Sequence, residues 1–369
     1  MSPVLPDSDP SGIPPALLGA LQSLIASARI RVAIGVNAEM VLLYWDIGER
    51  IRTEILKDER AAYGKQVVNT LSDQLVMQYG TGFTRTNLFN MIRFAEVFPD
   101  RFIIHSLSGQ LSWTHFRHII YIEDSLAREF YLEICRLERW SVRTLQAKIQ
   151  GMLFERTALA KRPEELARKE LAALRNEDLM TPDLVFKSPY FLDFLGLADS
   201  FSEKDLENSI LRELERFILE LGTDFSFVAR QKRITVDAED YYIDLLFYHR
   251  KLHRLVAIEL KLGTFKAADK GQVELYLRWL NKYDRQPGEE PPLGLILCAG
   301  SSAGHIELLE LETGSIRVAE YLTELPPREV LEQKLKSAVA IARERLAART
   351  AGKTGTVKKG KRHLTGEGT

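Results

Sequence analysis

Two short apolar segments in the last third of this 369-residue chain carry charged side chains where buried strands should have none. Residues 241–248 (YYIDLLFY) and 255–263 (LVAIELKLG) are rich in aromatic, β-branched and aliphatic residues, which predicts two core strands. Asp244 lies in the first segment, and Glu259 and Lys261 lie in the second. Because burying an unpaired carboxylate is costly, charges at these positions indicate a functional site.

The spacing predicts how these charges meet. Side chains on a strand alternate between two faces, so Glu259 and Lys261 point the same way. If residues 249–253 form a tight reversal, the two strands pair as a hairpin with Asp244 opposite Glu259. Directly opposed residues have Cβ atoms roughly 4.5–5.5 Å apart, so the two carboxylates would repel each other. A divalent cation between them would remove that repulsion, and Mg²⁺ binds one or two carboxylates together with substrate phosphates.

The charged residues also form a known pattern. Asp244, a gap of fourteen residues and then Glu259-x-Lys261 on a hydrophobic strand resemble the core motif of the PD-(D/E)XK nucleases. The sequence departs from the family name at one position, since Ile243 stands where the name implies a proline. The resemblance implies a restriction-endonuclease-like α/β fold, in which a mixed sheet is flanked by helices.

A narrower resemblance covers most of the chain. Four strings are similar to the bacterial YhcG-like family: YYIDLLFYH at 241–249 with Glu-Leu-Lys at 259–261, YWDIG at 44–48, YGK at 63–65 and WSVR at 140–143. The resemblance runs from about residue 15 to residue 340. It implies a mainly α-helical N-terminal domain followed by a C-terminal PD-(D/E)XK nuclease domain.

Two helices extend the predicted site. Residues 266–283 read as an amphipathic helix on which Gln272 and Tyr276 are four apart and share a face. Their spacing resembles the Gln-x-x-x-Tyr pattern of the RecB-like branch of these nucleases. Residues 203–221 read as a second helix, with acidic residues in its first turn. The family places a glutamate on the helix before the first active-site strand, which implies Glu207 here.

The resemblance assigns roles to these residues. Asp244, Glu259 and the main-chain carbonyl of Leu260 would hold Mg²⁺ (or Mn²⁺). Lys261 would position or help deprotonate the attacking water and stabilise charge on the phosphate. Gln272, Tyr276 and Glu207 would complete the catalytic set. The expected activity is that of a metal-dependent endodeoxyribonuclease acting in repair, recombination or defence against foreign DNA. The alternative is a non-catalytic nucleic-acid-binding module with a helical domain that recruits a partner or dimerises.

The composition along the chain predicts five segments. They are a flexible arm (1–14), a helical domain for DNA or partner binding (15–158), a helical linker (159–185), the nuclease domain (186–347) and a disordered basic tail (348–369). Within the nuclease domain, the unbroken apolar run at 293–298 predicts a fully buried strand.

Two pairs of residues are candidate nucleic-acid contacts. Arg230 and Lys232 come just before the active-site hairpin, where they could bind phosphates. Arg85 and Asn87 begin a helix after the turn at 80–82, as in a helix-turn-helix, and could meet phosphates or base edges. The alternative for the second pair is an ordinary pair of helices with Thr84 as the cap.

Composition limits the partners and the compartment. The formal net charge of −1 excludes a uniformly basic nucleic-acid binder, so any binding surface must be a local patch. Cys135 and Cys298 lie in apolar segments, which favours reduced thiols in a cytoplasmic protein. The sequence shows neither an apolar run of roughly 18 residues nor a signal-peptide pattern, so we expect no membrane partner. A homodimer through the N-terminal helical domain is a further expectation.

Overall fold

The computed structural model describes residues 15–54, 61–197, 200–222, 224–301, 306, 308–309, 311 and 314–359. The chain divides into two compact units, Met1–Gln146 and Ala147–Thr369, which are described separately below. The flexible arm predicted for residues 1–14 lies outside the described residues.

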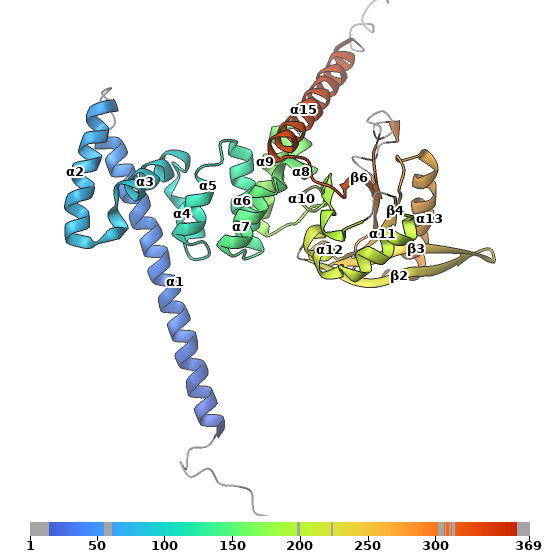
Figure 1. The fold of residues 1–369 in the computed structure, drawn as a ribbon, viewed down its shortest axis with the longest axis horizontal. Helices are drawn as coiled ribbons and strands as arrows, with labels where there is room; N and C mark the ends of the chain where they lie inside the picture. The colour runs from blue at the N-terminus through green and yellow to red at the C-terminus, as the bar shows by residue number, and fades with distance from the viewer. Residues whose placement is uncertain are drawn as a thin grey trace, which may run out of the picture. The chain divides into compact units, whose positions relative to one another are not determined.

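The described elements of the first unit are helices (Figure 1). They are α1 (Pro15–Glu54), α2 (Ala61–Tyr79), the short 3₁₀ helix η1 (Thr81–Phe83), α3 (Arg85–Val97), α4 (Arg101–Ser108), α5 (Trp113–Ile119), α6 (Ser125–Leu137) and α7 (Val142–Gln150), which crosses the division between the units. The predicted helical character of this region is confirmed.

The close approach of α1 to α3 organises the core of this unit. Gly48 of α1 lies directly against the α3 backbone, so that an added Cβ would sit 1.9 Å from the carbonyl oxygen of Met91. Tyr44 and Trp45 of α1 are buried, and the Trp45 indole donates a hydrogen bond to the carbonyl of Phe98 at 2.7 Å. The YWDIG string is therefore a packing motif that lets two helices touch.

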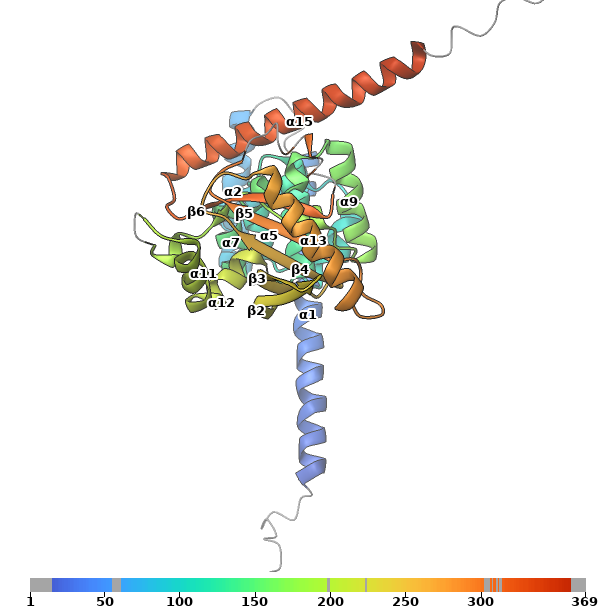
Figure 2. The ribbon, with the colours of Figure 1, turned by 90° about the vertical axis from the view of Figure 1, so that its right-hand side faces the viewer.

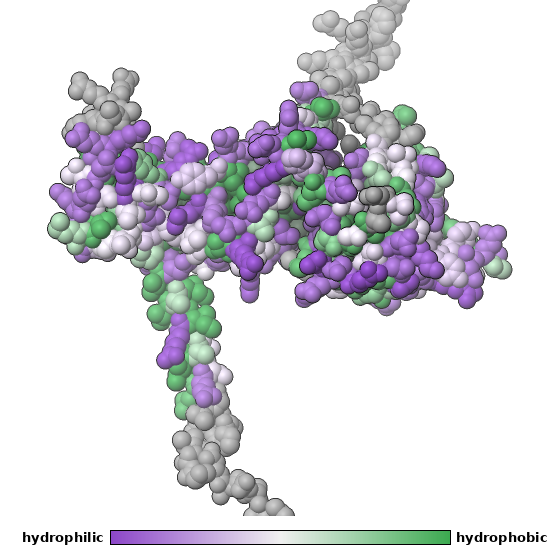
Figure 3. Space-filling model, viewed as in Figure 1, coloured by the Kyte–Doolittle hydropathy of each residue, from purple (hydrophilic) through white to green (hydrophobic). Residues whose placement is uncertain are grey.

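The N-terminal half of α1 presents apolar side chains to solvent (Figure 3). Leu24, Ile30 and Val32 are 66%, 60% and 65% exposed. Contiguous apolar surface of this kind commonly marks an interaction site. The homodimer expected through this domain would have such a surface available, and it stays a prediction. None of the described helices has the length and apolarity that a membrane span requires.

A six-stranded mixed sheet forms the centre of the second unit, in the order β1-β6-β5-β4-β3-β2 (Figures 1 and 2). The strands are β1 (Tyr190–Phe191), β2 (Phe225–Val236), β3 (Glu239–His249), β4 (Arg254–Leu260), β5 (Leu293–Cys298) and β6 (Ile316–Leu322). β2, β3 and β4 are antiparallel neighbours, whereas β4, β5, β6 and β1 run parallel. The mixed sheet flanked by helices is confirmed, and β5 matches the predicted buried strand.

The described helices of this unit are α8 (Leu153–Arg156), the 3₁₀ helix η2 (Leu159–Lys161), α9 (Glu164–Glu177), α10 (Pro182–Val185), the 3₁₀ helix η3 (Asp193–Leu195), α11 (Glu203–Arg212), α12 (Leu214–Leu221), α13 (Ala267–Tyr283) and α15 (Arg328–Lys359). The helix predicted over 203–221 is thus divided into α11 and α12 at Glu213.

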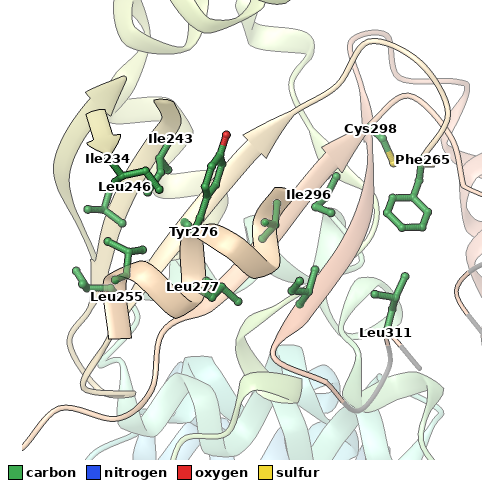
Figure 4. Close-up of a cluster of buried hydrophobic side chains, with 14 residues drawn as sticks. Ile234, Ile243, Leu246, Leu255, Phe265, Tyr276, Leu277, Ile296, Cys298 and Leu311 are labelled. Atoms are coloured by element: carbon green, nitrogen blue, oxygen red, sulfur yellow. The ribbon is translucent and has the colours of Figure 1, made fainter. Parts of the chain in front are cut away.

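Helices α12 and α13 cover opposite faces of the sheet. Leu246 of β3 belongs to the same buried cluster as Leu277 of α13 (Figure 4). The next residue of β3, Phe247, packs its ring 6.1 Å from that of Phe217 on α12. Because successive strand residues point to opposite faces, the two helices lie on different sides of β3. The centre of the sheet is therefore covered from both sides, and β4 is buried from Leu255 to Leu260.

The segments around two of the predicted boundaries pack as follows. Arg156, near the end of the predicted helical domain, forms an ion pair with Glu220 at 2.6 Å, and Asp183 of the predicted linker forms one with Arg317 at 3.2 Å. The compact units divide after Gln146, and the domain and linker bounds predicted from the sequence stay a prediction. At the other end, α15 continues to Lys359, through residues whose composition predicts disorder. The rest of the predicted tail, residues 360–369, lies outside the described residues.

Candidate active site

The structure brings Asp244 and Glu259 to the point where β3 and β4 stop pairing. Leu245 pairs with Ile258, and continuing that register places Asp244 opposite Glu259, as the spacing predicts. Beyond this pair the main-chain N–H of Leu260 donates to a side chain of β3: Asp244 Oδ2 accepts its hydrogen bond at 2.9 Å. The two carboxylates therefore come from neighbouring antiparallel strands.

Glu259 is 3% exposed. Its Oε1 accepts a hydrogen bond from Lys261 Nζ at 2.8 Å, while its buried Oε2 has no hydrogen-bond partner among the described residues. Burial and the charge of Asp244 raise the pKa of Glu259 to about 7. Burial also raises the pKa of Asp244, although hydrogen bonds from Leu260 and Gln231 partly offset it. The site therefore holds negative charge at an energetic cost, and a cation would reduce that cost.

Lys261 supplies the positive charge of this site. Burial lowers the pKa of its ammonium, but the hydrogen bond and charge of Glu259, with further charge from Glu203 and Asp244, outweigh burial and leave the pKa raised. Lys261 is therefore protonated at neutral pH. Its side chain is held against Glu259 and can donate further hydrogen bonds to a ligand oxygen.

Glu207 reaches the site through an intermediary that sequence reasoning missed. Its carboxylate, on α11, is 7% exposed, and Oε2 accepts a hydrogen bond from Gln231 Nε2 at 2.9 Å. The same Gln231 nitrogen donates to Asp244 Oδ1 at 3.1 Å. Gln231 thus joins the helix glutamate to the strand aspartate. The available signal was one neutral amide within a basic run, Arg230-Gln231-Lys232-Arg233.

Glu203 was also missed. It lies one turn before Glu207 on α11, and its charge acts on the pKa values of Asp244, Glu259 and Lys261. Residues four apart share a helix face, so its position follows from that of Glu207.

Gln272 and Tyr276 lie together on α13, as their spacing predicts. Gln272 Nε2 donates to the Tyr276 hydroxyl at 2.5 Å, and that hydroxyl donates to the carbonyl of Tyr242 at 3.0 Å. The ring packs in the apolar cluster, with the hydroxyl directed away from Leu277 (Figure 4). Burial, with smaller effects of Glu259 and Asp244, raises the pKa of Tyr276 to about 12, so the phenol stays neutral.

The two basic residues before the hairpin have acidic partners within this unit. Arg230 is about half exposed, and its Nε lies 3.4 Å from Glu207 Oε1. Lys232 Nζ lies 3.1 Å from Asp284 Oδ2. Arg230 is therefore the one of the pair placed beside a predicted site residue, and a phosphate-binding role for either stays a prediction.

Arg85 and Asn87 belong to the first unit. The Arg85 guanidinium lies 5.8 Å from the ring centroid of Phe89. The amide of Asn87 donates to the carbonyl of Gly82 at 2.5 Å and accepts from the indole of Trp113 at 2.9 Å. Both ends of that amide thus hold the start of α3 in place. Nucleic-acid contact by this pair stays a prediction.

The residues where β3 and β4 stop pairing fit a divalent cation. The carboxylates of Asp244 and Glu259 are hard oxygen ligands, and Glu259 Oε2 is a buried acceptor without a hydrogen-bond donor among the described residues. The Leu260 carbonyl stays a predicted third ligand. Within the described part of the chain no group of three or more His, Cys, Asp or Glu residues is arranged to hold a metal. The donor set is instead the sparse one that Mg²⁺ accepts, because that ion keeps several waters and binds substrate phosphates.

A mixed sheet with Asp, Glu and Lys brought together by two adjacent antiparallel strands defines the PD-(D/E)XK class of restriction-endonuclease-like proteins. Residues 20–156 match the DUF1016 N-terminal domain, and residues 183–338 match the YhcG PDDEXK nuclease domain. The chain is 33% identical over 353 residues to an Escherichia coli (strain K12) protein described as "Putative nuclease YhcG", covering 87% of this chain and 93% of that protein. The chain therefore belongs to the YhcG family.

One solved structure is similar in part. The "crystal structure of a repair endonuclease from Pyrococcus abyssi" is 19% identical, and the match covers 35% of this chain and 50% of that chain. The TM-score is 0.24, which is too low to bear on the fold or the function of this protein.

Proposed function

We propose that this protein is a Mg²⁺-dependent nuclease that hydrolyses phosphodiester bonds of DNA. The observation that carries the proposal is the grouping of two carboxylates and one ammonium where β3 and β4 stop pairing. Continuing their register places Asp244 opposite Glu259, whose Oε1 is 2.8 Å from Lys261 Nζ. Glu259 Oε2, buried and without a hydrogen-bond donor among the described residues, is available to a cation.

The chain's own residues would divide the work. Asp244, Glu259 and the Leu260 carbonyl would hold Mg²⁺ or Mn²⁺, which when bound activates water and offsets charge on the phosphate. Lys261 has a raised pKa, so it is suited to donating hydrogen bonds to the attacking water or a phosphate oxygen rather than to removing a proton. Gln272 donates a hydrogen bond to the Tyr276 hydroxyl, which donates to the main chain of β3, and both would orient neighbouring groups.

Alanine substitutions at two positions test this proposal. Asp244→Ala removes a metal ligand and Lys261→Ala removes the ammonium, so each should lower Mg²⁺-dependent plasmid cleavage by at least about 100-fold. Asp240→Ala is the matched control on the same strand, because Asp240 is exposed at the hairpin turn and bonds to Thr235 and Arg233. Circular dichroism should show the same fold for all variants.

The substrates separate the remaining alternatives. Purified protein should be incubated with plasmid, single-stranded, duplex and branched DNA and with RNA, each with Mg²⁺. Cleavage of RNA alone would contradict the choice of DNA. If Asp244→Ala or Lys261→Ala cut plasmid as fast as the unmodified protein, the nuclease proposal would be wrong. Nucleic-acid binding without Mn²⁺ binding would instead indicate a non-catalytic module.

A further inference from the structure

We propose that Gln231 is a positioning residue that fixes the Asp244 carboxylate for cation binding and joins Glu207 to the active site. The inference rests on the proposed metal-dependent function. It is carried by three observations: the two hydrogen bonds of the Gln231 amide, the second anchor on Asp244, and the backbone conformation of Gln231 itself.

The Gln231 amide uses its nitrogen toward both carboxylates. Nε2 lies 2.9 Å from Glu207 Oε2 and 3.1 Å from Asp244 Oδ1. A side-chain amide nitrogen has two N–H donors, one for each carboxylate. The opposite amide orientation would face an oxygen toward two carboxylates and would be repulsive, so the chemistry fixes the assignment.

Asp244 is held from both neighbouring strands. Its Oδ1 accepts from the Gln231 side chain on β2, and its Oδ2 accepts from the Leu260 main-chain N–H on β4. The plane of the carboxylate is thereby fixed between its neighbours. Groups that orient a metal ligand in this way typically contribute 10- to 100-fold to metal affinity or activity.

The neutrality of Gln231 suits this role. An arginine or lysine in its place would cancel the negative charge that a cation requires. The two flanking basic residues have other ion-pair partners than Asp244: Arg230 lies 3.4 Å from Glu207 Oε1, and Lys232 lies 3.1 Å from Asp284. Among these three consecutive residues, the neutral one is placed against Asp244.

The backbone at Gln231 is strained. Its φ is 43°, in the left-handed region that few non-glycine residues adopt. Such conformations cost stability and cluster at functional sites. Glycine would relieve the strain at this position but would lack the amide. The strained glutamine is therefore explained by what its side chain does.

Mn²⁺ binding to the full-length protein tests the role directly. Gln231→Gly should weaken Mn²⁺ binding, measured by electron paramagnetic resonance and by calorimetry, by about 10- to 100-fold. Its melting temperature should equal or exceed that of the unmodified protein, because glycine accepts a positive φ without strain. Gln231→Ala should lose the same affinity without that gain. In both variants, the Mn²⁺ concentration needed for half-maximal cleavage should rise by the same factor.

The matched control is Thr235→Ala on β2, the strand that carries Gln231. It removes an exposed side-chain hydrogen bond to Asp240 of β3 and should bind Mn²⁺ normally. Wild-type Mn²⁺ affinity in folded Gln231→Gly would overturn the positioning role and leave the proposed nuclease intact. The positioning role would also be overturned if both variants lost Mn²⁺ affinity only in proportion to a loss of melting temperature. If the unmodified protein bound no Mn²⁺, the proposed function and this inference would fail together.

Discussion

At the residue scale, Glu259 shows how a core strand can carry charge. The strand around it is buried on both faces, yet one carboxylate oxygen is bonded to Lys261 and the other is free of any described donor. A glutamate chosen for stability alone would not be placed there, because burial of a carboxylate is unfavourable. Active sites commonly retain such costly groups.

The raised pKa of Glu259 predicts a pH dependence for cation binding. The carboxyl titrates near pH 7, above its ordinary value of 4.5, so it still holds a proton at pH 6, where an ordinary glutamate is ionised. A cation must displace that proton, and Mn²⁺ affinity should fall roughly tenfold per pH unit below pH 7. Calorimetry between pH 5.5 and 8.5 checks this. An affinity that stayed level down to pH 5.5 would contradict it, and Glu259→Gln should bind poorly throughout.

At the element scale, α1 shows what the YWDIG string does. In the sequence the string matches the family pattern but carries no obvious chemistry, which predicts that Tyr44 and Trp45 pack a helix. In the structure its members pack: Tyr44 and Trp45 are buried, and Gly48 allows α1 to touch the backbone of α3. Asp46 forms an exposed ion pair with Arg101. The string therefore specifies a helix crossing rather than chemistry.

Two glycines in α1 give a matched test of that crossing. Gly48→Ala would place a methyl group 1.9 Å from a carbonyl oxygen that cannot move aside cheaply, so the first unit should lose about 1–3 kcal/mol of stability. Gly35→Ala meets nothing within 4 Å and should gain about 0.5–1 kcal/mol, because alanine favours a helix. Urea unfolding measures both. Equal effects at the two positions would show that the helices do not meet at Gly48.

At the scale of the whole molecule, a buried ion pair joins the segment before residue 186 to the second unit. Arg156 is 3% exposed and binds Glu220, which also lies 3.4 Å from Lys187. Residues 147–185 therefore supply the Arg156 guanidinium, which neutralises the buried Glu220 carboxylate of the second unit. Breaking a buried ion pair is costly because the remaining charge stays buried without its partner.

Two fragments test this boundary. A fragment of residues 147–369 should unfold cooperatively, because it keeps Arg156 with Glu220. A fragment of residues 186–369 should be less stable by about 3–5 kcal/mol or fail to fold. Urea unfolding followed by circular dichroism compares them. Equal stability would place the domain start near residue 186, as the composition predicts.

The sequence by itself determined the part of this protein that depends on local periodicity. Strand alternation placed Glu259 and Lys261 on one face, the length of the reversal set Asp244 opposite Glu259, and helical spacing paired Gln272 with Tyr276. These relations hold wherever the segment forms a strand or a helix, since they follow from backbone geometry.

Only the tertiary structure decided the contacts between segments far apart in the chain. Gln231 donates a hydrogen bond to Glu207, which is 24 residues away. The backbone of Gln231 is in the left-handed region, which strand alternation does not anticipate. Arg156 reaches Glu220, 64 residues away, and joins the segment before residue 186 to the second unit. Such contacts depend on how the helices dock on the sheet, which is fixed by packing of the whole core and not by any local pattern.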